Sequence, residues 1–242
     1  MQYFFSILDW AAWAPGVDTE EKWREWGRSP VKLDGKGVPL VDDLPMMFRR
    51  RLGRLGRVVM RTACDIPQNG AHMVFSSRYG ESSQTVKLLQ DLAKNEPLSP
   101  TKFSTSVHNG LAGLFSIHSK NTAPHTVIAA GKNSFLHALL ETVALLIEKP
   151  GRSVLLVHYD EPLPEFYEPF VDHDVPMLSL AMHLVGRQDS DEKLDVTISC
   201  EDKLDDPCNM DGALSFIRFL TGQGDGWVWP MGPKTWKCQT HV

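Results

Sequence analysis

The chain has 242 residues, enough to bury a sizeable core in one domain, and 42% of them are hydrophobic. It carries 25 Lys and Arg against 30 Asp and Glu, a formal net charge of −5 that does not favour nucleic acid binding. No apolar run approaches the ~20 residues of a membrane-spanning helix. The first residues also lack the basic segment and apolar core of a signal peptide.

The amino-terminal third predicts one strand and one long helix. Met1–Trp10 is typical of a strand that enters the core at once. Residues 11–45 are rich in Trp, Pro and Gly, and we expect an irregular segment with a short helix near Glu20–Trp26. Phe48–Cys64 has apolar residues on one face and predicts the first long helix.

Arginines gather on the opposite face of this predicted helix, at Arg49, Arg50, Arg51, Arg54 and Arg57. A solvated face with local ion pairs is the ordinary interpretation of such a pattern. Nucleic acid binding is an alternative that the acidic chain disfavours.

The middle of the chain alternates strands and helices. We expect a strand at His72–Ser77, a helix at Ser82–Ala93, a helix from about Val107, a short strand at His125–Ala130 and a helix from Lys132 to Glu148. The strand at His125–Ala130 is short and apolar, which indicates a buried or paired strand. A strand that turns directly into a helix is also where many enzymes place a nucleophile.

The last third predicts three strands, at Ser153–Tyr159, Met177–Val185 and Leu194–Cys200. Asp211–Leu220 follows as a short helix before a Trp-rich tail. This order predicts an α/β fold: a mostly parallel, five-stranded mixed sheet with helices on both faces. We place the main domain at residues 1–202 and expect residues 203–242 to pack on it.

The spacing of the four cysteines indicates the redox state of the compartment and whether a metal site is expected. Cys64, Cys200, Cys208 and Cys238 lack the paired spacing of a zinc site or a disulfide framework. We therefore expect reduced thiols and a cytoplasmic protein, with no cofactor.

Other chemically active residues lack the context of a known site. Ser76 and Ser77 are not flanked by the G-x-S-x-G pattern of hydrolases. His158-x-Asp160 and residues 172–174 offer nitrogen and oxygen ligands without the spacing of known metal sites, so we expect no metal.

Two motifs carry a resemblance to a known family. They are Met73–Glu81, MVFSSRYGE, and Phe103–Asn109, FSTSVHN. The second lies in a longer run that resembles the segment preceding the nucleophile in β-ketoacyl synthases of the thiolase superfamily. The chain is most similar to ketosynthase-like chain length factors, particularly those of aryl polyene pathways, over most of Met1–Val185. The resemblance implies a single thiolase-like half.

The resemblance also implies what the corner after the strand lacks. In catalytic ketosynthases this strand ends in a nucleophilic cysteine, whereas no cysteine lies between Cys64 and Cys200 here. The nucleophile position falls on or beside Gly131, so we expect no catalytic residue. Ketosynthases supply their oxyanion donors largely from a second half, which is almost absent after Asp202.

The expected function is therefore that of a non-catalytic subunit. The resemblance implies a heterodimer with a catalytic β-ketoacyl-[acyl carrier protein] synthase in polyketide or fatty-acid-type biosynthesis. There the subunit would stabilise or shape the acyl-chain site, and it would meet the acyl carrier protein indirectly. The alternative is a small independent α/β enzyme such as a hydrolase.

The family assigns three sets of residues to this function. The expected partner interface is the strand His125, Thr126, Val127, Ile128, Ala129 and Ala130, which the resemblance places at an edge of the sheet. The expected acyl-pocket lining is Lys132, Asn133, Phe135 and His137. The expected contact with the acidic carrier protein is Arg49, Arg50, Arg54 and Arg57, because a basic patch suits an acidic partner.

Overall fold

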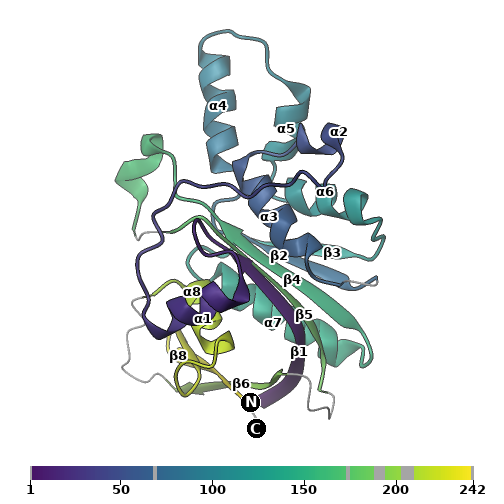
Figure 1. Ribbon diagram of the computed structural model, residues 1–242, viewed down its shortest axis with the longest axis vertical. Coiled ribbons are helices and arrows are strands. Elements are labelled where there is room, and N and C mark those ends of the chain that lie inside the picture. Colours follow the sequence, from purple (N-terminus) through teal and green to yellow (C-terminus); the bar gives the residue numbers. More distant parts are fainter. Residues whose placement is uncertain (1, 68–69, 173–174, 188–193, 203–209, 241–242) are drawn as a thin grey trace.

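The computed structural model describes residues 2–67, 70–172, 175–187, 194–202 and 210–240. Figure 1 shows one sheet with helices on both faces and a helical projection, α4 and α5, beyond one end. The strands are β1 (Gln2–Trp13), β2 (His72–Ser76), β3 (His125–Ile128), β4 (Ser153–Asp160), β5 (Leu178–Gly186), β6 (Leu194–Asp202), β7 (Trp227–Met231) and β8 (Lys234–Thr240). The helices are α1 (Glu20–Arg28), α2 (Met46–Arg49), α3 (Arg54–Cys64), α4 (Ser82–Ala93), α5 (Pro100–Ser106), α6 (Gly110–Ser119), α7 (Ser134–Glu148) and α8 (Gly212–Leu220), with a 3-10 helix η1 (Glu165–Phe170).

The sheet has eight strands in the order β3-β2-β4-β5-β1-β6-β8-β7. β2 runs parallel to β3 and β4, whereas the other ladders among the described strands are antiparallel. The α/β class and the mixed sheet are confirmed, but the prediction of a mostly parallel, five-stranded sheet is wrong in number and direction. Connections explain the difference: β2, β3 and β4 follow one another through helices, as parallel neighbours require.

The Trp-rich tail supplies two of the additional strands. β7 and β8 form an antiparallel hairpin whose two-residue connection begins at Gly232, with φ +59°. Trp227 and Trp229 occupy alternate positions of β7 and are both buried. The tail thus extends the sheet at its edge. The predicted short helix is confirmed as α8, and the domain boundary at residue 202 stays a prediction because residues 203–209 lie outside the described part.

Alternating strand residues divide between two cores, one on each face of the sheet. Met73 and Phe75 of β2 pack with residues of α3 and α6, whereas Val74 packs on the other side with residues of α7, α8 and α1. This arrangement confirms the prediction of helices on both faces. Within the described residues, no helix combines the length and apolar character needed to cross a bilayer.

The predicted long helix at Phe48–Cys64 is interrupted. α2 ends at Arg49, and α3 begins at Arg54 with the extended residue Gly53 as its N-cap. The amide of Gly56 donates to the carboxylate of Glu81, which lies at the start of α4. A Cβ at Gly53 would lie 2.8 Å from Glu81 Oε2. Glycine therefore lets a distant carboxylate reach the amino end of α3, where the helix dipole favours negative charge.

Glu81 is 7% exposed, and one of its oxygens, Oε1, has no hydrogen-bond partner among the residues that the structure describes. Burial, followed by the nearby Glu161 carboxylate, raises the pKa of Glu81 from 4.5 to about 7. Since the folded-state pKa exceeds the unfolded value, stability from this group is complete below pH 4.5 and is lost as pH rises toward 7.

We predict that Glu81→Gln flattens the pH dependence of unfolding between pH 4.5 and 7. A neutral amide mimics the protonated acid, so the variant should gain stability relative to the wild type by on the order of 3 kcal/mol across this window. Urea unfolding at several pH values measures the difference. Parallel stability curves for the two proteins would contradict the assignment.

Candidate functional site

The corner between β3 and α7 is a turn whose hydrogen bonds mostly join residues of the turn to one another. The Ser134 hydroxyl donates to the Gly131 carbonyl at 2.7 Å and accepts from the Ala130 amide at 3.0 Å. The amides of Asn133 and Ser134 donate to the carbonyls of Ala130 and Gly131. The corner that the sequence predicted is present, and its shape depends on Ser134.

Gly131 adopts φ +59°, in the left-handed region that favours glycine. An ideal Cβ at this position would meet no atom within 4 Å among the described residues. A side chain here would have room but would carry a backbone cost of about 1–2 kcal/mol.

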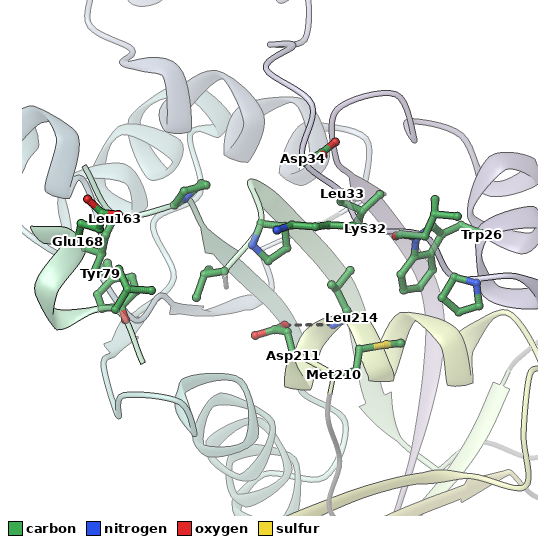
Figure 2. A pocket seen from close by; sticks show the side chains of 16 residues that line it. Trp26, Lys32, Leu33, Asp34, Tyr79, Leu163, Glu168, Met210, Asp211 and Leu214 are labelled. Carbon is green, nitrogen blue, oxygen red and sulfur yellow. Dashed lines mark hydrogen bonds between the residues drawn. The ribbon is translucent and has the colours of Figure 1, made fainter. Parts of the chain in front are cut away.

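The four residues expected to line an acyl pocket have separate surroundings. Lys132 is exposed at the corner. Asn133 Oδ1 accepts from Trp229 Nε1 at 3.0 Å, and the Asn133 carbonyl is hydrogen-bonded to His137 Nδ1 at 2.9 Å. Phe135 is 3% exposed and packs against aromatic rings of the core. None of the four is among the residues that line a cavity of about 680 Å³ beside Trp26, Tyr79 and Leu214 (Figure 2).

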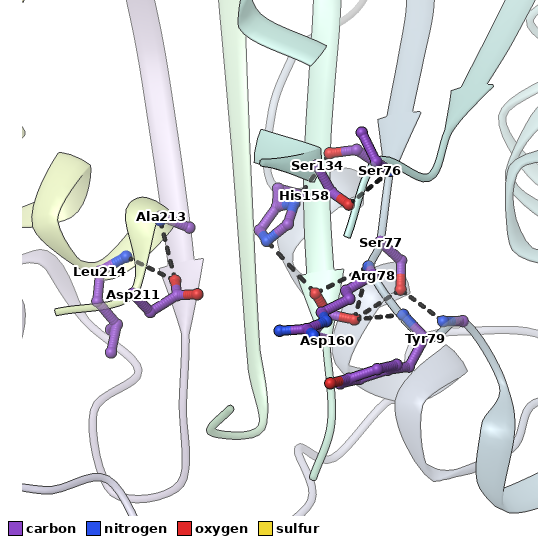
Figure 3. A network of polar contacts seen from close by, with 12 residues as sticks. Ser76, Ser77, Arg78, Tyr79, Ser134, His158, Asp160, Asp211, Ala213 and Leu214 are labelled. Carbon is purple, nitrogen blue, oxygen red and sulfur yellow. Dashed lines mark hydrogen bonds and ion pairs between the residues drawn. The ribbon is translucent and has the colours of Figure 1, made fainter. Parts of the chain in front are cut away.

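A buried polar network lies beside this corner, at the carboxyl ends of β2 and β4 (Figure 3). Ser76 Oγ is hydrogen-bonded to His158 Nδ1 at 2.9 Å. The Asp160 carboxylate accepts from Ser77 Oγ at 2.7 Å and from the amides of Arg78 and Tyr79. The network therefore ties the end of β2 to the end of β4.

His158 Nε2 also lies 3.6 Å from Asp160 Oδ2, so the order Ser76, His158, Asp160 resembles a hydrolase triad. Ser76 is fully buried, and His158 and Asp160 are 4% and 5% exposed. A nucleophile must reach its substrate, so this buried serine does not support the hydrolase alternative. Burial raises the pKa of Asp160, while His158 and the N–H and O–H donors oppose that shift.

Sequence reasoning considered these residues only separately, as metal ligands or as a serine nucleophile. One signal could have found them together. His158 and Asp160 are two apart on a strand and share a face, opposite two serines on a predicted neighbouring strand. Among the described residues, no group of three or more His, Cys, Asp or Glu could hold a metal ion. Cys208, His173 and Asp174 lie outside those residues.

The arginines of the cluster lie at the surface and differ in their contacts, with Arg49 half-buried and Arg50, Arg54 and Arg57 exposed. Arg49 pairs with Asp42, and Arg54 donates to the carbonyl of Lys36 at 3.1 Å. The sequence grouped these arginines on one helix, whereas the break before α3 separates them.

The strand at His125–Ile128 forms one edge of the sheet, as predicted. Pro124 and Ile128 accept from the amides of Met73 and Ser77, so these alternate positions face β2. Because backbone direction alternates along a strand, His125 and Val127 direct their N–H and C=O groups to the open edge.

The family model for the β-ketoacyl synthase N-terminal domain matches residues 23–239. The chain therefore belongs to the β-ketoacyl synthase family. Its fold is the thiolase-like fold of the ketosynthase structures that it resembles.

Solved structures agree with this assignment. The chain is 25% identical to a chain of the ketosynthase ApeO in complex with its chain length factor ApeC from Xenorhabdus doucetiae, with a TM-score of 0.82. That alignment covers 97% of this chain and 98% of the other. The ishigamide ketosynthase/chain length factor matches at 17% identity and TM-score 0.66, over 93% and 75% of the two chains. A β-ketoacyl synthase from Burkholderia phymatum matches at 10% identity and TM-score 0.57, over 93% and 71%. Comparison with curated protein sequences gave no match.

We predict that Asp160→Ala lowers the free energy of unfolding by about 3 kcal/mol or more, because it leaves the Ser77 hydroxyl and the amides of Arg78 and Tyr79 without their buried acceptor. Urea unfolding measures the loss. Asp42→Ala removes an exposed ion pair and serves as the control, with an expected cost below about 1 kcal/mol. Equal effects of the two substitutions would show that the network does not hold β2 to β4.

Proposed function

We propose that this chain is a non-catalytic, chain-length-factor-like subunit of a ketosynthase complex. It pairs with a catalytic β-ketoacyl-[acyl carrier protein] synthase in polyketide or fatty-acid-type biosynthesis, of the aryl polyene kind. The observation that carries the proposal is the near-complete mutual coverage with a chain of a ketosynthase–chain length factor complex. The ketosynthase from Burkholderia phymatum, in contrast, is covered over only 71% of its length.

The chemistry at the corner supports a non-catalytic role. Condensation needs a thiolate to hold the growing acyl chain as a thioester, whose carbonyl stays electrophilic. Gly131 has no side chain, and Cys64 and Cys200, which flank the corner in sequence, lie on other elements, α3 and β6. The subunit then acts through the partner, by stabilising the partner's acyl site.

The two edges of the sheet support a particular mode of pairing. On β3, Val127 directs its N–H to the open edge, which can accept a strand from another subunit. On β7, at the opposite edge, Pro230 has no N–H to offer. We expect the ketosynthase to pair along β3 through an obligate-type interface above ~2,000 Å².

The proposal also assigns roles to the positive charges of the arginine cluster and of Lys132. Arg50 and Arg57 are exposed and supply the positive charge for an acidic carrier protein. Arg49 and Arg54 hold the segment around residues 36–42 through their own contacts. Lys132 lies next to Gly131 and adds positive charge beside the proposed interface.

We predict that Val127→Pro abolishes the complex with the ketosynthase while the variant still folds. Proline removes an outward N–H and leaves the hydrogen bonds to β2 in place. Co-expression followed by size-exclusion chromatography measures the complex, and thermal unfolding checks the fold.

Val228→Pro is the matched control. Val228 lies two residues before Pro230 on the other edge strand, so its N–H also faces outward, and the complex should survive this substitution. A complex that tolerates Val127→Pro, or that is lost in both variants, would contradict pairing along β3.

We also predict that Gly131→Cys creates no ketosynthase. The new thiol would sit in open surroundings on a strained backbone, without neighbours close enough to its Cβ to fix it. Condensation assays with carrier-bound acyl and malonyl groups test this. Turnover by the variant in the absence of any partner would overturn the non-catalytic account.

A further inference from the structure

A side-chain hydrogen bond connects the two ends of the sheet. The edge strands β3 and β7 are first and last in the strand order. In Figure 1 the sheet bends around α7 and α8 between these two ends. Trp229 of β7 reaches the corner that follows β3, where its Nε1 donates to Asn133 Oδ1 at 3.0 Å. The carboxyl-terminal hairpin is therefore connected directly to this corner.

Asn133 uses its side chain for this contact instead of capping its own helix. It occupies the N-cap position of α7, where an asparagine oxygen usually accepts from an amide of the first turn. Its side chain makes no capping bond within the described residues. The oxygen accepts from the Trp229 indole instead. The asparagine thus serves the contact between the hairpin and the corner.

Trp229 is itself held in place by its surroundings. It is 8% exposed, and its ring lies parallel to that of Trp227, with 6.3 Å between the ring centres. A Cβ at Gly212 would lie 3.4 Å from two carbons of the Trp229 ring, so the start of α8 also packs closely against it. Because hydrogen bonds weaken when they are distorted, a donor held in this way restricts where its acceptor can lie.

The neighbouring indole of β7 bonds to a different element. Trp227 Nε1 donates to the Ser215 hydroxyl at 2.8 Å and to the Gly212 carbonyl at 3.1 Å, and both acceptors belong to α8. Its ring packs edge-on against Phe135, with 5.8 Å between the ring centres. Trp227 and Trp229 therefore offer two matched substitutions, each of which removes an indole N–H, but with different partners.

The position of Asn133 determines where the rest of the corner lies. Its amide donates to the Ala130 carbonyl at 3.1 Å, so a displacement of Asn133 also displaces the end of the β3 segment. Gly131 and Lys132 lie between these two residues and are exposed. A change at Asn133 therefore alters the surface beside the open edge of β3.

We propose that Trp229 is a positioning residue that fixes the corner, and with it the end of the β3 segment, from the other end of the sheet. The positioning follows from the contacts of Trp229 and Asn133 alone. Its consequence for assembly rests on the proposed function: a corner held in one geometry loses less conformational freedom when the ketosynthase binds beside it. The carboxyl-terminal hairpin then contributes to an interface at the opposite edge.

Hydrogen exchange of the full chain, followed peptide by peptide with mass spectrometry, tests the positioning. Trp229→Phe keeps an aromatic ring and removes the N–H, so the amides of residues 130–136 should exchange about 3- to 10-fold faster, the share of one hydrogen bond. Trp227→Phe is the matched control. It removes the bonds to α8, so it should speed exchange in α8 and leave residues 130–136 unchanged.

Substitutions of the acceptor give an independent test. Asn133→Ala should reproduce the faster exchange of Trp229→Phe, and the double variant should exchange no faster than either single one. Asn133→Asp keeps an acceptor oxygen and should exchange like the wild type. If Trp229→Phe does not fold, the comparison of Asn133→Ala with Asn133→Asp decides.

Three results would overturn the proposal: unchanged exchange at the corner in Trp229→Phe, equally faster exchange in every peptide, or Asn133→Asp behaving like Asn133→Ala. Dissociation of the co-expressed ketosynthase complex in urea then measures the effect on assembly. The Trp229→Phe complex should dissociate at lower urea than the Trp227→Phe complex. A looser corner with equal dissociation would support the positioning and count only against ketosynthase binding beside the corner, which belongs to the proposed function.

Discussion

The structure at the carboxyl ends of β2 and β4 depends on the hydrogen bonds that the Asp160 carboxylate accepts. This carboxylate lies at the end of β4 and accepts from the backbone just after β2, so this buried group adds a side-chain connection to the backbone ladder between the two strands. β3 pairs with β2, and the corner at Gly131 follows β3. The same backbone bonds fix Tyr79, whose ring forms one wall of the cavity. β3, the corner at Gly131 and the cavity beside Tyr79 are therefore all connected to Asp160. A displacement of Asp160 would displace all three.

The parts of the fold that could be predicted are those whose pattern is local. The segments that became β2, α4, β4 and α7 each combine a periodic apolar pattern with clear boundaries, and the structure reproduces them within a few residues. The edge position of β3 was also predicted, although from family resemblance and not from the residues of the strand itself. The corner could be located because small and polar residues between a strand and a helix have few other uses.

The remaining features depend on pairs of residues that are distant in sequence. Gly53 interrupts the predicted helix because Glu81, on another element, needs the space that a side chain would fill. The antiparallel half of the sheet follows from connection geometry, which apolar periodicity does not encode. The bond between Ser76 and His158 joins positions 82 residues apart. In each case the strand or helix is visible in the sequence, and its partner is not.

Pro230 has a consequence for how large an assembly of this protein can grow. A sheet with two open edges can add subunits in both directions, and such growth has no end point short of a fibre. Here the β7 edge has no outward N–H at Pro230 and keeps one at Val228, while the β3 edge keeps its outward N–H at Val127. Under the proposed pairing along β3, the partner uses the better donor edge, and Pro230 makes the opposite edge a poorer template for a further strand. One residue at the far edge then favours an assembly that stops at two subunits.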